Sequence, residues 1–298
     1  MQSRQATVIH NTRAGVVGHA DLCDRVAKIL QKHEIRAECH EVDGGQGIEK
    51  LVQGAVRRGN FAVVAAGGDG TVSCVASGLV GAEAALGVVP VGTLNHFAKD
   101  THIPLDIERA AETIAAGRLR RVDVGEVNGR FFVNNSSLGL YPSLVRDRQY
   151  EQRLGRSKWA AFLFATLAVL RRRQRSFSIR LVSDDGKAVT RRTALVFIGN
   201  NRYEMNGLKI GSRPSLETGK LAVYVLHHER ALSILRMGIE AVIGKLRDGV
   251  DFDFLLTDRV QIEVRRPRVH VATDGEVSTF APPLNYRIHP RALRVLVP

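Results

Sequence analysis

Hydrophobic and polar positions along the first 126 residues predict strands and helices in alternation. Strands are predicted at Thr7–His10, Arg36–Val42, Phe61–Ala66 and Leu86–Pro90. Four amphipathic segments predict helices, at Ala20–Lys32, Ile48–Arg58, Val72–Leu79 and Ile107–Ala116. This alternation is typical of a mainly parallel sheet with helices on both faces, and such sheets bind ligands at the carboxyl ends of their strands.

The pattern changes near residue 125, where signals for β-hairpins begin. Asn128-Gly129 and Asp185-Gly186 each separate two strand-like segments, and these dipeptides favour tight antiparallel turns. The predicted strands are Asp123–Val127, Phe131–Asn134, Phe177–Ser183, Ala188–Arg192, Leu195–Gly199, Leu221–Leu226, Val260–Val264, Val269–Thr273 and Tyr286–His289. Two predicted helices, Ser157–Arg173 and Ala231–Lys245, interrupt them.

These patterns predict two domains. We expect residues 1–125 to form an α/β domain and residues 126–298 to form a β-rich, mostly antiparallel sandwich. We expect the extreme C-terminus to pack back onto the first domain.

The charge balance indicates an anionic partner. Lys and Arg outnumber Asp and Glu by 43 to 30, which gives a net charge of +13. Nucleic acid, a nucleotide or an acidic membrane surface would each fit this charge. The helix Ser157–Arg173 leads into an arginine-rich segment, Arg171–Arg175, which suits either an acidic membrane interface or the cationic last turn of a core helix.

The sequence predicts a cytoplasmic protein that associates peripherally with membranes. The apolar segment Trp159–Leu170 is shorter than the about 20 residues that a membrane span needs. The N-terminus lacks the apolar core of a signal peptide. Cys23, Cys39 and Cys74 are odd in number and far apart, so we expect no disulfide framework and a reducing compartment.

The glycine-rich string Gly67-Gly68-Asp69-Gly70-Thr71 is the strongest indication of function. It follows the predicted strand Phe61–Ala66, and its glycines allow a sharp turn that phosphate oxygens can approach. Thr71 is expected to cap the next helix, whose N-terminus attracts anions. Asp69 would repel phosphates unless it held a cation or handled a proton. The string therefore predicts a Mg²⁺–nucleotide site, and an ordinary βα turn capped by Asp69 is the alternative.

Three further strings accompany this turn: Gly92-Thr93-Leu94-Asn95-His96-Phe97-Ala98, Arg121-Val122-Asp123-Val124-Gly125 and Thr273-Asp274-Gly275-Glu276-Val277. Together with Asn11, they resemble the diacylglycerol kinase catalytic-domain family, which includes bacterial lipid kinases, sphingosine kinases and ceramide kinases. The glycine-Asp-Gly-Thr string is also similar to that of NAD kinases. The Gly92–Ala98 string and the late Asp-Gly-Glu single out the lipid kinases.

The resemblance implies that ATP lies between the two domains of a fold like that of NAD kinases and diacylglycerol kinases. It makes residues 1–125 the nucleotide-binding domain and residues 126–298 the domain that receives the lipid substrate. It places Asn11 by the nucleotide, Asn95 near its phosphates, and Asp69 and Asp123 in a network that organises Mg²⁺. It makes Glu276 the general base on a lipid hydroxyl. The phosphate contacts that it implies are Gly67, Gly68, Gly70, Thr71 and Thr93.

Each of these roles has a structural alternative. Asn95 could cap the following turn, and Asp123 could be an ordinary carboxylate at the end of a strand. Asp274-Gly275 could be only a hairpin turn that leaves Glu276 solvated.

The chain departs from the family pattern in the stretch Glu41–Gly47, from which we carry no role over, and at two positions that concern metal binding. His96 stands where the family usually has an Asp of the metal network, and a histidine cannot replace the charge of a carboxylate. It could contact a phosphate instead. Thr218 stands where some bacterial members have the Asp of a structural Mg²⁺ site. These positions leave the details of metal binding open.

The resemblance and the residues together predict an ATP-dependent lipid kinase that uses Mg²⁺ and works at an anionic membrane surface. The lipid is diacylglycerol-like or sphingoid, and the sequence does not name it. A NAD kinase-like enzyme and a non-catalytic nucleotide- or lipid-binding regulator are the alternatives. We expect no nucleic-acid partner, because no motif of that kind is present. The oligomeric state is open, and a homodimer is one option.

Overall fold

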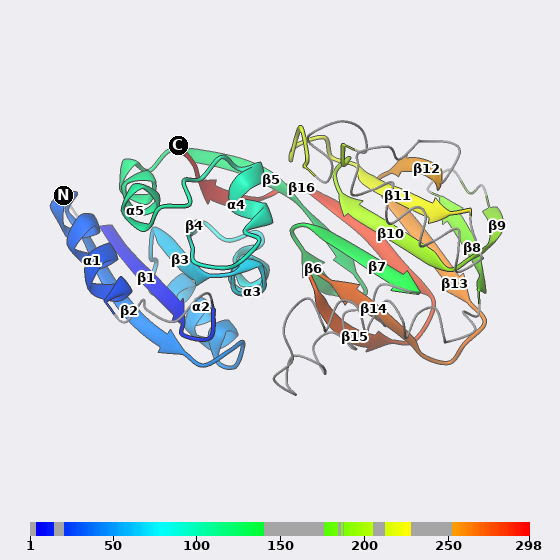
Figure 1. The fold of residues 1–298 in the computed structure, drawn as a ribbon, viewed down its shortest axis with the longest axis horizontal. Helices are drawn as coiled ribbons and strands as arrows, with labels where there is room; N and C mark the ends of the chain where they lie inside the picture. Colours follow the sequence, from blue (N-terminus) through cyan, green and yellow to red (C-terminus); the bar gives the residue numbers. More distant parts are fainter. Residues whose placement is uncertain are drawn as a thin grey trace. The chain divides into compact units, whose positions relative to one another are not determined.

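The computed structural model describes residues 4–14, 21–139, 176–183, 186, 188–204, 212–227 and 252–298. The chain divides into two compact units, one of residues 1–124 with 289–298 and one of residues 125–288 (Figure 1). The predicted helices Ser157–Arg173 and Ala231–Lys245 lie outside the described residues.

A parallel sheet forms the centre of the first unit. Its strands are β1 (Arg4–Asn11), β2 (Ile35–Val42), β3 (Ala62–Gly67), β4 (Ala85–Pro90) and the last part of β16 (Leu284–Leu296). Their order is β2-β1-β3-β4-β16, and every pair is parallel. The sequence-based prediction of a mainly parallel sheet is confirmed, and β16 extends it with the C-terminal residues.

Within the described part of the first unit, five helices accompany this sheet. They are α1 (Leu22–Lys32), α2 (Ile48–Arg57), α3 (Asp69–Leu79), α4 (His96–Asp100) and α5 (Ile107–Ala116). In α1 the buried side chains Leu22, Val26 and Leu30 recur every fourth residue and so form one apolar face. Helix α1 packs beside α5, and α2 packs beside α3.

The second unit is a sandwich of antiparallel sheets. One sheet has the order β12-β11-β10-β7-β14-β15, and a second layer joins β9, β8, β13 and the first part of β16. The short hairpin of β5 and β6 adjoins β16. Their bounds are β5 (Leu119–Val127), β6 (Arg130–Phe132), β7 (Asn135–Gly139), β8 (Phe177–Ser183), β9 (Ala188–Thr193), β10 (Leu195–Asn200), β11 (Leu221–Leu226), β12 (Phe252–Thr257), β13 (Arg259–Val264), β14 (Val269–Thr273) and β15 (Glu276–Phe280).

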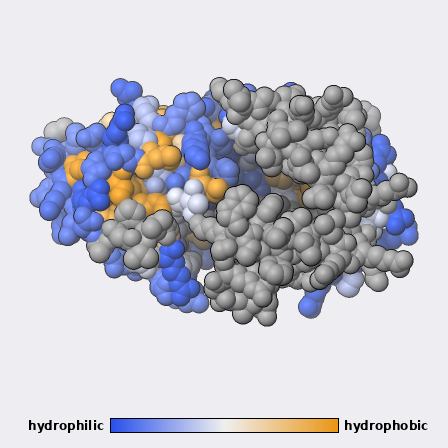
Figure 2. Space-filling model, viewed as in Figure 1, coloured by the Kyte–Doolittle hydropathy of each residue, from blue (hydrophilic) through white to orange (hydrophobic). Residues whose placement is uncertain are grey.

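One hydrophobic core holds the two layers of the sandwich together. Leu138, Ile198 and Val223 come from one sheet, and Ile262 and Tyr286 come from the other. Burial raises the pKa of Tyr286, whose hydroxyl lies 3.0 Å from that of Ser136. On the face shown in Figure 2, most of the coloured surface is hydrophilic, and a patch of hydrophobic residues shows over the first unit.

The structure corrects two expectations. Thr71 does not cap α3, because the helix begins two residues earlier, at Asp69, and Gly68 occupies the N-cap position. Cys23 and Cys39 form a disulfide, with their Cα atoms 6.0 Å apart, although the sequence suggested no such pairing. Among the described residues, no helix is long and apolar enough to cross a membrane.

Candidate functional site

The glycine-rich turn connects the end of β3 to the start of α3. Gly68 is extended and leads into the helix, whose first internal hydrogen bond runs from the N–H of Val72 to the carbonyl of Gly68 at 3.0 Å. Gly68 has no side chain and so makes no capping hydrogen bond to the first amides of α3. A Cβ at Gly67 would overlap the side chain of Thr71, so this close turn requires glycine there. The first amides of α3 are therefore the donors that an anion can approach.

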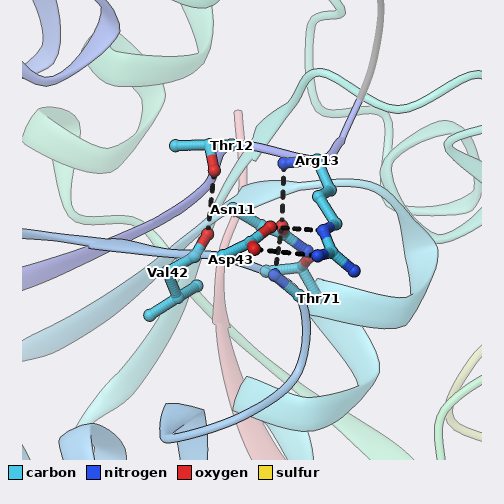
Figure 3. A network of polar contacts seen from close by, with 7 residues as sticks. Asn11, Thr12, Arg13, Val42, Asp43 and Thr71 are labelled. Atoms are coloured by element: carbon cyan, nitrogen blue, oxygen red, sulfur yellow. Dashed lines mark hydrogen bonds and ion pairs between the residues drawn. The ribbon is translucent and has the colours of Figure 1, made fainter.

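Asn11 ties this turn to the ends of the neighbouring strands. Its side-chain amide donates to the hydroxyl of Thr71 at 2.9 Å, and its carbonyl oxygen accepts from the N–H groups of Arg13 and Gly44 at 3.1 and 3.2 Å. Figure 3 shows Asn11 between Thr71 and the loop that carries Thr12 and Arg13. The network holds together the carboxyl ends of β1, β2 and β3.

The loop after β4 lies directly against the glycine-rich turn. The N–H of Val91 donates to the carbonyl of Gly67 at 3.1 Å. A Cβ at Gly92 would clash with the backbone of Gly68, so the two chains approach as closely as two glycines allow. The two strings that the sequence singled out are thus brought together in the first unit.

The side chain of Asn95 stabilises the loop after β4 by hydrogen bonds to its backbone. It is buried and left-handed, with φ of 53°, a conformation that Asn tolerates better than most residues. Its side chain accepts from the N–H of Gly92 at 3.1 Å and donates to the carbonyl of Gly92 at 2.9 Å. Thr93 and His96 are exposed on either side of Asn95.

The two predicted metal-organising carboxylates are held by backbone N–H groups. Asp69 Oδ1 accepts from the N–H of Phe97 at 3.3 Å, which links the glycine-rich turn to α4. Asp123 is only 1% exposed, and its Oδ1 accepts from the N–H of Arg291 at 2.8 Å. Carboxylate oxygens are ligands that suit Mg²⁺, and half-buried Asp69 lies at the end of β3 where phosphates are expected.

In the second unit, Asp274 and Gly275 form the turn of the β14–β15 hairpin. Their φ angles are 48° and 86°, as a type I′ turn requires. Asp274 does more than turn the chain. Its carboxylate accepts from the N–H groups of Val133 and Asn134 at 2.8 Å and of Asn135 at 3.0 Å. The side chain thereby anchors the hairpin to the segment between β6 and β7.

Glu276 follows this turn as the first residue of β15. Its side chain is 50% exposed, and its Oε2 accepts from the guanidinium of Arg130 at 2.7 Å. Arg130 also contacts the hydroxyl of Ser278. Arg130 and the anchored turn therefore fix the carboxylate of Glu276 at an accessible position.

Sequence reasoning did not identify the residues that support the predicted site. Arg130 acts through its charged side chain and lies in no motif, whereas Gly44 and Phe97 act through backbone N–H groups, whose contacts no motif reveals. For the hydrogen bonds that Asp274 accepts from residues 133–135, the only signal in the sequence was the Asp-Gly dipeptide, which favours a turn with positive φ. At the family's structural-metal turn, Thr218 donates its N–H to Asn201 Oδ1 at 2.9 Å.

The fold of the chain is that of a kinase family. A model of the diacylglycerol kinase catalytic domain matches residues 5–127, and a model of the YegS C-terminal NAD kinase beta sandwich-like domain matches residues 143–297. The chain belongs to the diacylglycerol kinase catalytic-domain family.

Curated relatives cover most of the chain. It is 26% identical over 287 residues to the diacylglycerol kinase of Bacillus subtilis (strain 168), which covers 94% of this chain and 92% of that protein. It is 30% identical over 271 residues to the diacylglycerol kinase of Mycobacterium tuberculosis (strain CDC 1551 / Oshkosh), covering 87% and 84%.

Solved structures share the fold. A crystal structure of a diacylglycerol kinase from Bacillus anthracis str. Sterne has a TM-score of 0.72 at 19% identity and covers 99% of this chain and 97% of that chain. The NAD kinase of Archaeoglobus fulgidus, solved in complex with ATP, has a TM-score of 0.56 at 13% identity, with coverage of 98% and 93%. These likenesses confirm the predicted fold class.

Proposed function

We propose that this protein is an ATP-dependent lipid kinase that transfers the γ-phosphoryl group of ATP to the hydroxyl of a diacylglycerol-like or sphingoid lipid. The observation that carries the proposal is the packing of the glycine-rich turn on the Gly92–Asn95 loop, with Asn11 bound to Thr71. This arrangement offers backbone N–H groups to an anion. Membership of the diacylglycerol kinase family supports a lipid rather than a soluble acceptor.

The first unit supplies the phosphate-binding part of the reaction. Gly67, Gly68 and Gly70 leave the backbone accessible, and the N-terminus of α3 favours negative charge. Thr71 presents a hydroxyl that Asn11 orients, and Thr93 offers a second, exposed hydroxyl on the adjoining loop. These groups neutralise and orient the phosphates, which is the main task of a phosphoryl-transfer enzyme.

Mg²⁺ bound with ATP supplies further neutralisation of phosphate charge. Asp69 fits a role in holding it, because its carboxylate is half-buried at the carboxyl end of β3. Asp123 supplies a second, deeply buried carboxylate, which the N–H of Arg291 orients.

Glu276 is the proposed general base. Its carboxylate takes the proton of the lipid hydroxyl, the hydroxyl oxygen forms a bond to the γ-phosphorus, and the bond from that phosphorus to ADP breaks. Arg130 positions the carboxylate for this step through the 2.7 Å ion pair. A positioned base of this kind accelerates a reaction by about 10²–10⁴.

The positive charge of the chain suits a lipid substrate at an anionic membrane. The net charge is +13, and the segment between β13 and β14 exposes Arg265, Arg266 and Arg268. Each exposed basic residue near an anionic bilayer contributes roughly 1 kcal/mol of attraction.

One experiment tests the whole proposal. The purified chain is incubated with γ-labelled ATP and Mg²⁺ together with a total membrane lipid extract, and the labelled products are separated. We expect label in a lipid product, and no label when Glu276→Gln replaces the wild type. A parallel reaction with NAD in place of lipid tests the alternative acceptor. Label in NADP alone would identify a NAD kinase, and label in neither product would favour a regulator.

A further inference from the structure

Three metal-ligating side chains meet at one end of the sheet in the first unit. His10 lies on β1, Glu41 lies opposite it on β2, and Cys23 is the second residue of α1. An imidazole nitrogen, a thiol sulfur and a carboxylate oxygen from these residues all lie within 4.8 Å of one another. The fold brings these side chains together, because His10 and Glu41 are paired in the parallel register of β1 and β2.

The imidazole of His10 is the second observation that indicates a ligand. His10 is only 4% exposed, and its Nδ1 is buried without a hydrogen bond. Glu41 Oε1 lies 3.5 Å from this nitrogen. Buried polar atoms without a partner are rare in native proteins, because each loses the hydrogen bonds that water would provide. A cation bound among His10, Cys23 and Glu41 would satisfy this nitrogen.

The third ligand is held in a covalent bond. The sulfur of Cys23 is joined to that of Cys39 on β2, and a disulfide sulfur is not the thiolate that binds a metal. We propose that reduction of the Cys23–Cys39 disulfide opens a site for a divalent transition metal, with Zn²⁺ as the preferred ion and His10, Cys23 and Glu41 as its protein ligands. This inference does not depend on the proposed kinase reaction.

A dithiol reductant supplies the two electrons and two protons that opening of the Cys23–Cys39 disulfide requires. The S–S bond between Cys23 and Cys39 breaks, two S–H bonds form, and the dithiol is oxidised to its own disulfide. Zn²⁺ then binds the sulfur of Cys23, and the thiol proton leaves to solvent. One nitrogen, one sulfur and one carboxylate oxygen are a donor set typical of Zn²⁺.

The geometry needs only a small adjustment. Zinc–ligand bonds of 2.0–2.3 Å place the ligand atoms of a tetrahedral site about 3–4 Å apart. The three atoms here already lie within 4.8 Å of one another. Bound metal would tie β1, β2 and α1 together immediately before Asn11, the residue that holds the glycine-rich turn.

Metal titration of the full-length chain tests this proposal. The oxidised and the dithiol-reduced proteins are freed of metal and reductant, and Zn²⁺ binding is measured by calorimetry and by metal analysis after desalting. We expect about one Zn²⁺ per chain in the reduced protein, held through desalting, and none retained in the oxidised protein. With Co²⁺ as the probe, the reduced protein should show the absorption band of a cobalt–thiolate bond.

Three cysteine variants separate the possible outcomes. Cys39→Ser removes the disulfide but keeps all three ligands, so it should bind Zn²⁺ without a reductant. Cys23→Ser should not bind with or without a reductant, and Cys74→Ser, which removes the cysteine outside the disulfide, should behave like the wild type. Equal loss of binding in Cys23→Ser and Cys39→Ser would overturn the three-ligand assignment. The wild type alone also tests the redox dependence. If its oxidised and reduced forms retain Zn²⁺ equally, or if neither form retains it, the proposal that reduction opens the site is wrong.

Discussion

The side-chain amide of Asn11 donates a 2.9 Å hydrogen bond to the hydroxyl of Thr71, a residue 60 positions further along the chain. The bond joins the end of β1 to the first turn of α3. It also fixes the rotamer of Thr71 beside the glycine-rich turn, while the oxygen of Asn11 holds the loops after β1 and β2. Asn11 therefore acts on the predicted phosphate site through Thr71, whatever direct contact it makes with a nucleotide.

Asn11→Ala should weaken ATP binding more than it slows turnover. The substitution removes hydrogen bonds that are each worth about 0.5–1.5 kcal/mol, so we expect KM for ATP to rise about ten-fold. Steady-state kinetics at varied ATP measure this split. Thr12→Val is the matched control, because it removes a neighbouring bond to the carbonyl of Val42 that does not involve Thr71. Similar KM values in the two variants would contradict the role of Asn11.

Gly92→Ala should destabilise the first unit and impair ATP binding. The added Cβ meets the backbone of Gly68 and the side chain of Asn95, and such overpacking costs about 1–3 kcal/mol. Urea unfolding measures the change in the free energy of unfolding. Gly45→Ala is the control, since a Cβ there meets nothing within 4 Å. A stable Gly92→Ala protein with normal KM for ATP would show that the two loops can separate without consequence.

The regular part of the fold could be predicted because local patterns determine it. The apolar run before Gly67 is a fully buried strand, and the prediction of α5 at Ile107–Ala116 matches the structure. The C-cap of α5, Gly117, is left-handed, and its N-cap Asp106 accepts from the N–H of Arg109 at 3.0 Å. Such signals lie within a few residues of the element that they define.

The contacts that sequence reasoning missed join distant segments. The disulfide of Cys23 and Cys39 depends on how α1 packs beside β2, and spacing along the chain does not reveal it. Strand β7 was missed because Asn135–Gly139 is mostly polar, although Ser136 and Ser137 are fully buried. Helix α4 was missed because it is short and begins after the left-handed Asn95. The relation of Glu276 to Arg130 arises only when β6 and β15 are folded.

Glu276→Gln should abolish most phosphoryl transfer while ATP still binds. Loss of a general base costs about 10²–10⁴ in rate, and the substitution preserves the shape of the side chain. Turnover and equilibrium ATP binding are measured on the same preparation. Glu263→Gln is the matched control, because Glu263 is also a half-exposed strand residue paired with an arginine, Arg180. More than half of the wild-type rate in Glu276→Gln would remove Glu276 from the role of base.

Arg130→Gln distinguishes positioning from proton transfer. It leaves the Glu276 carboxylate in place but removes the ion pair that orients it, so kcat should fall less than in Glu276→Gln. ATP binding should not change, because Arg130 belongs to the second unit and the predicted phosphate contacts belong to the first. A kcat equal to that of the wild type would mean that the ion pair has no catalytic consequence.

Replacing Arg171, Arg172, Arg173 and Arg175 with Gln should weaken binding to anionic vesicles. Each basic residue near the bilayer contributes roughly 1 kcal/mol, and the effect should shrink as salt screens the charges. Vesicle sedimentation at several fractions of anionic lipid measures it. A control with the same change in net charge replaces exposed arginines of the first unit, namely Arg36, Arg57, Arg109 and Arg118. Equal losses in both variants would indicate a dependence on net charge alone.

His96→Asp tests the main departure from the family pattern. His96 is exposed, it follows Asn95, and it begins α4, where an acidic residue is favourable for the helix dipole. The substitution should therefore not destabilise the fold, and thermal unfolding checks this. If His96 donates a hydrogen bond to a phosphate, Asp replaces attraction with repulsion. We expect KM for ATP to rise about five-fold, because one added charge near a phosphate costs about 1 kcal/mol in water-like surroundings.

Higher activity or a lower Mg²⁺ requirement would instead identify position 96 as part of a metal network that lost its carboxylate. His96→Asn separates the two effects, because it keeps a hydrogen-bond donor without adding charge, and it should stay close to the wild type if donation to a phosphate is the role of His96.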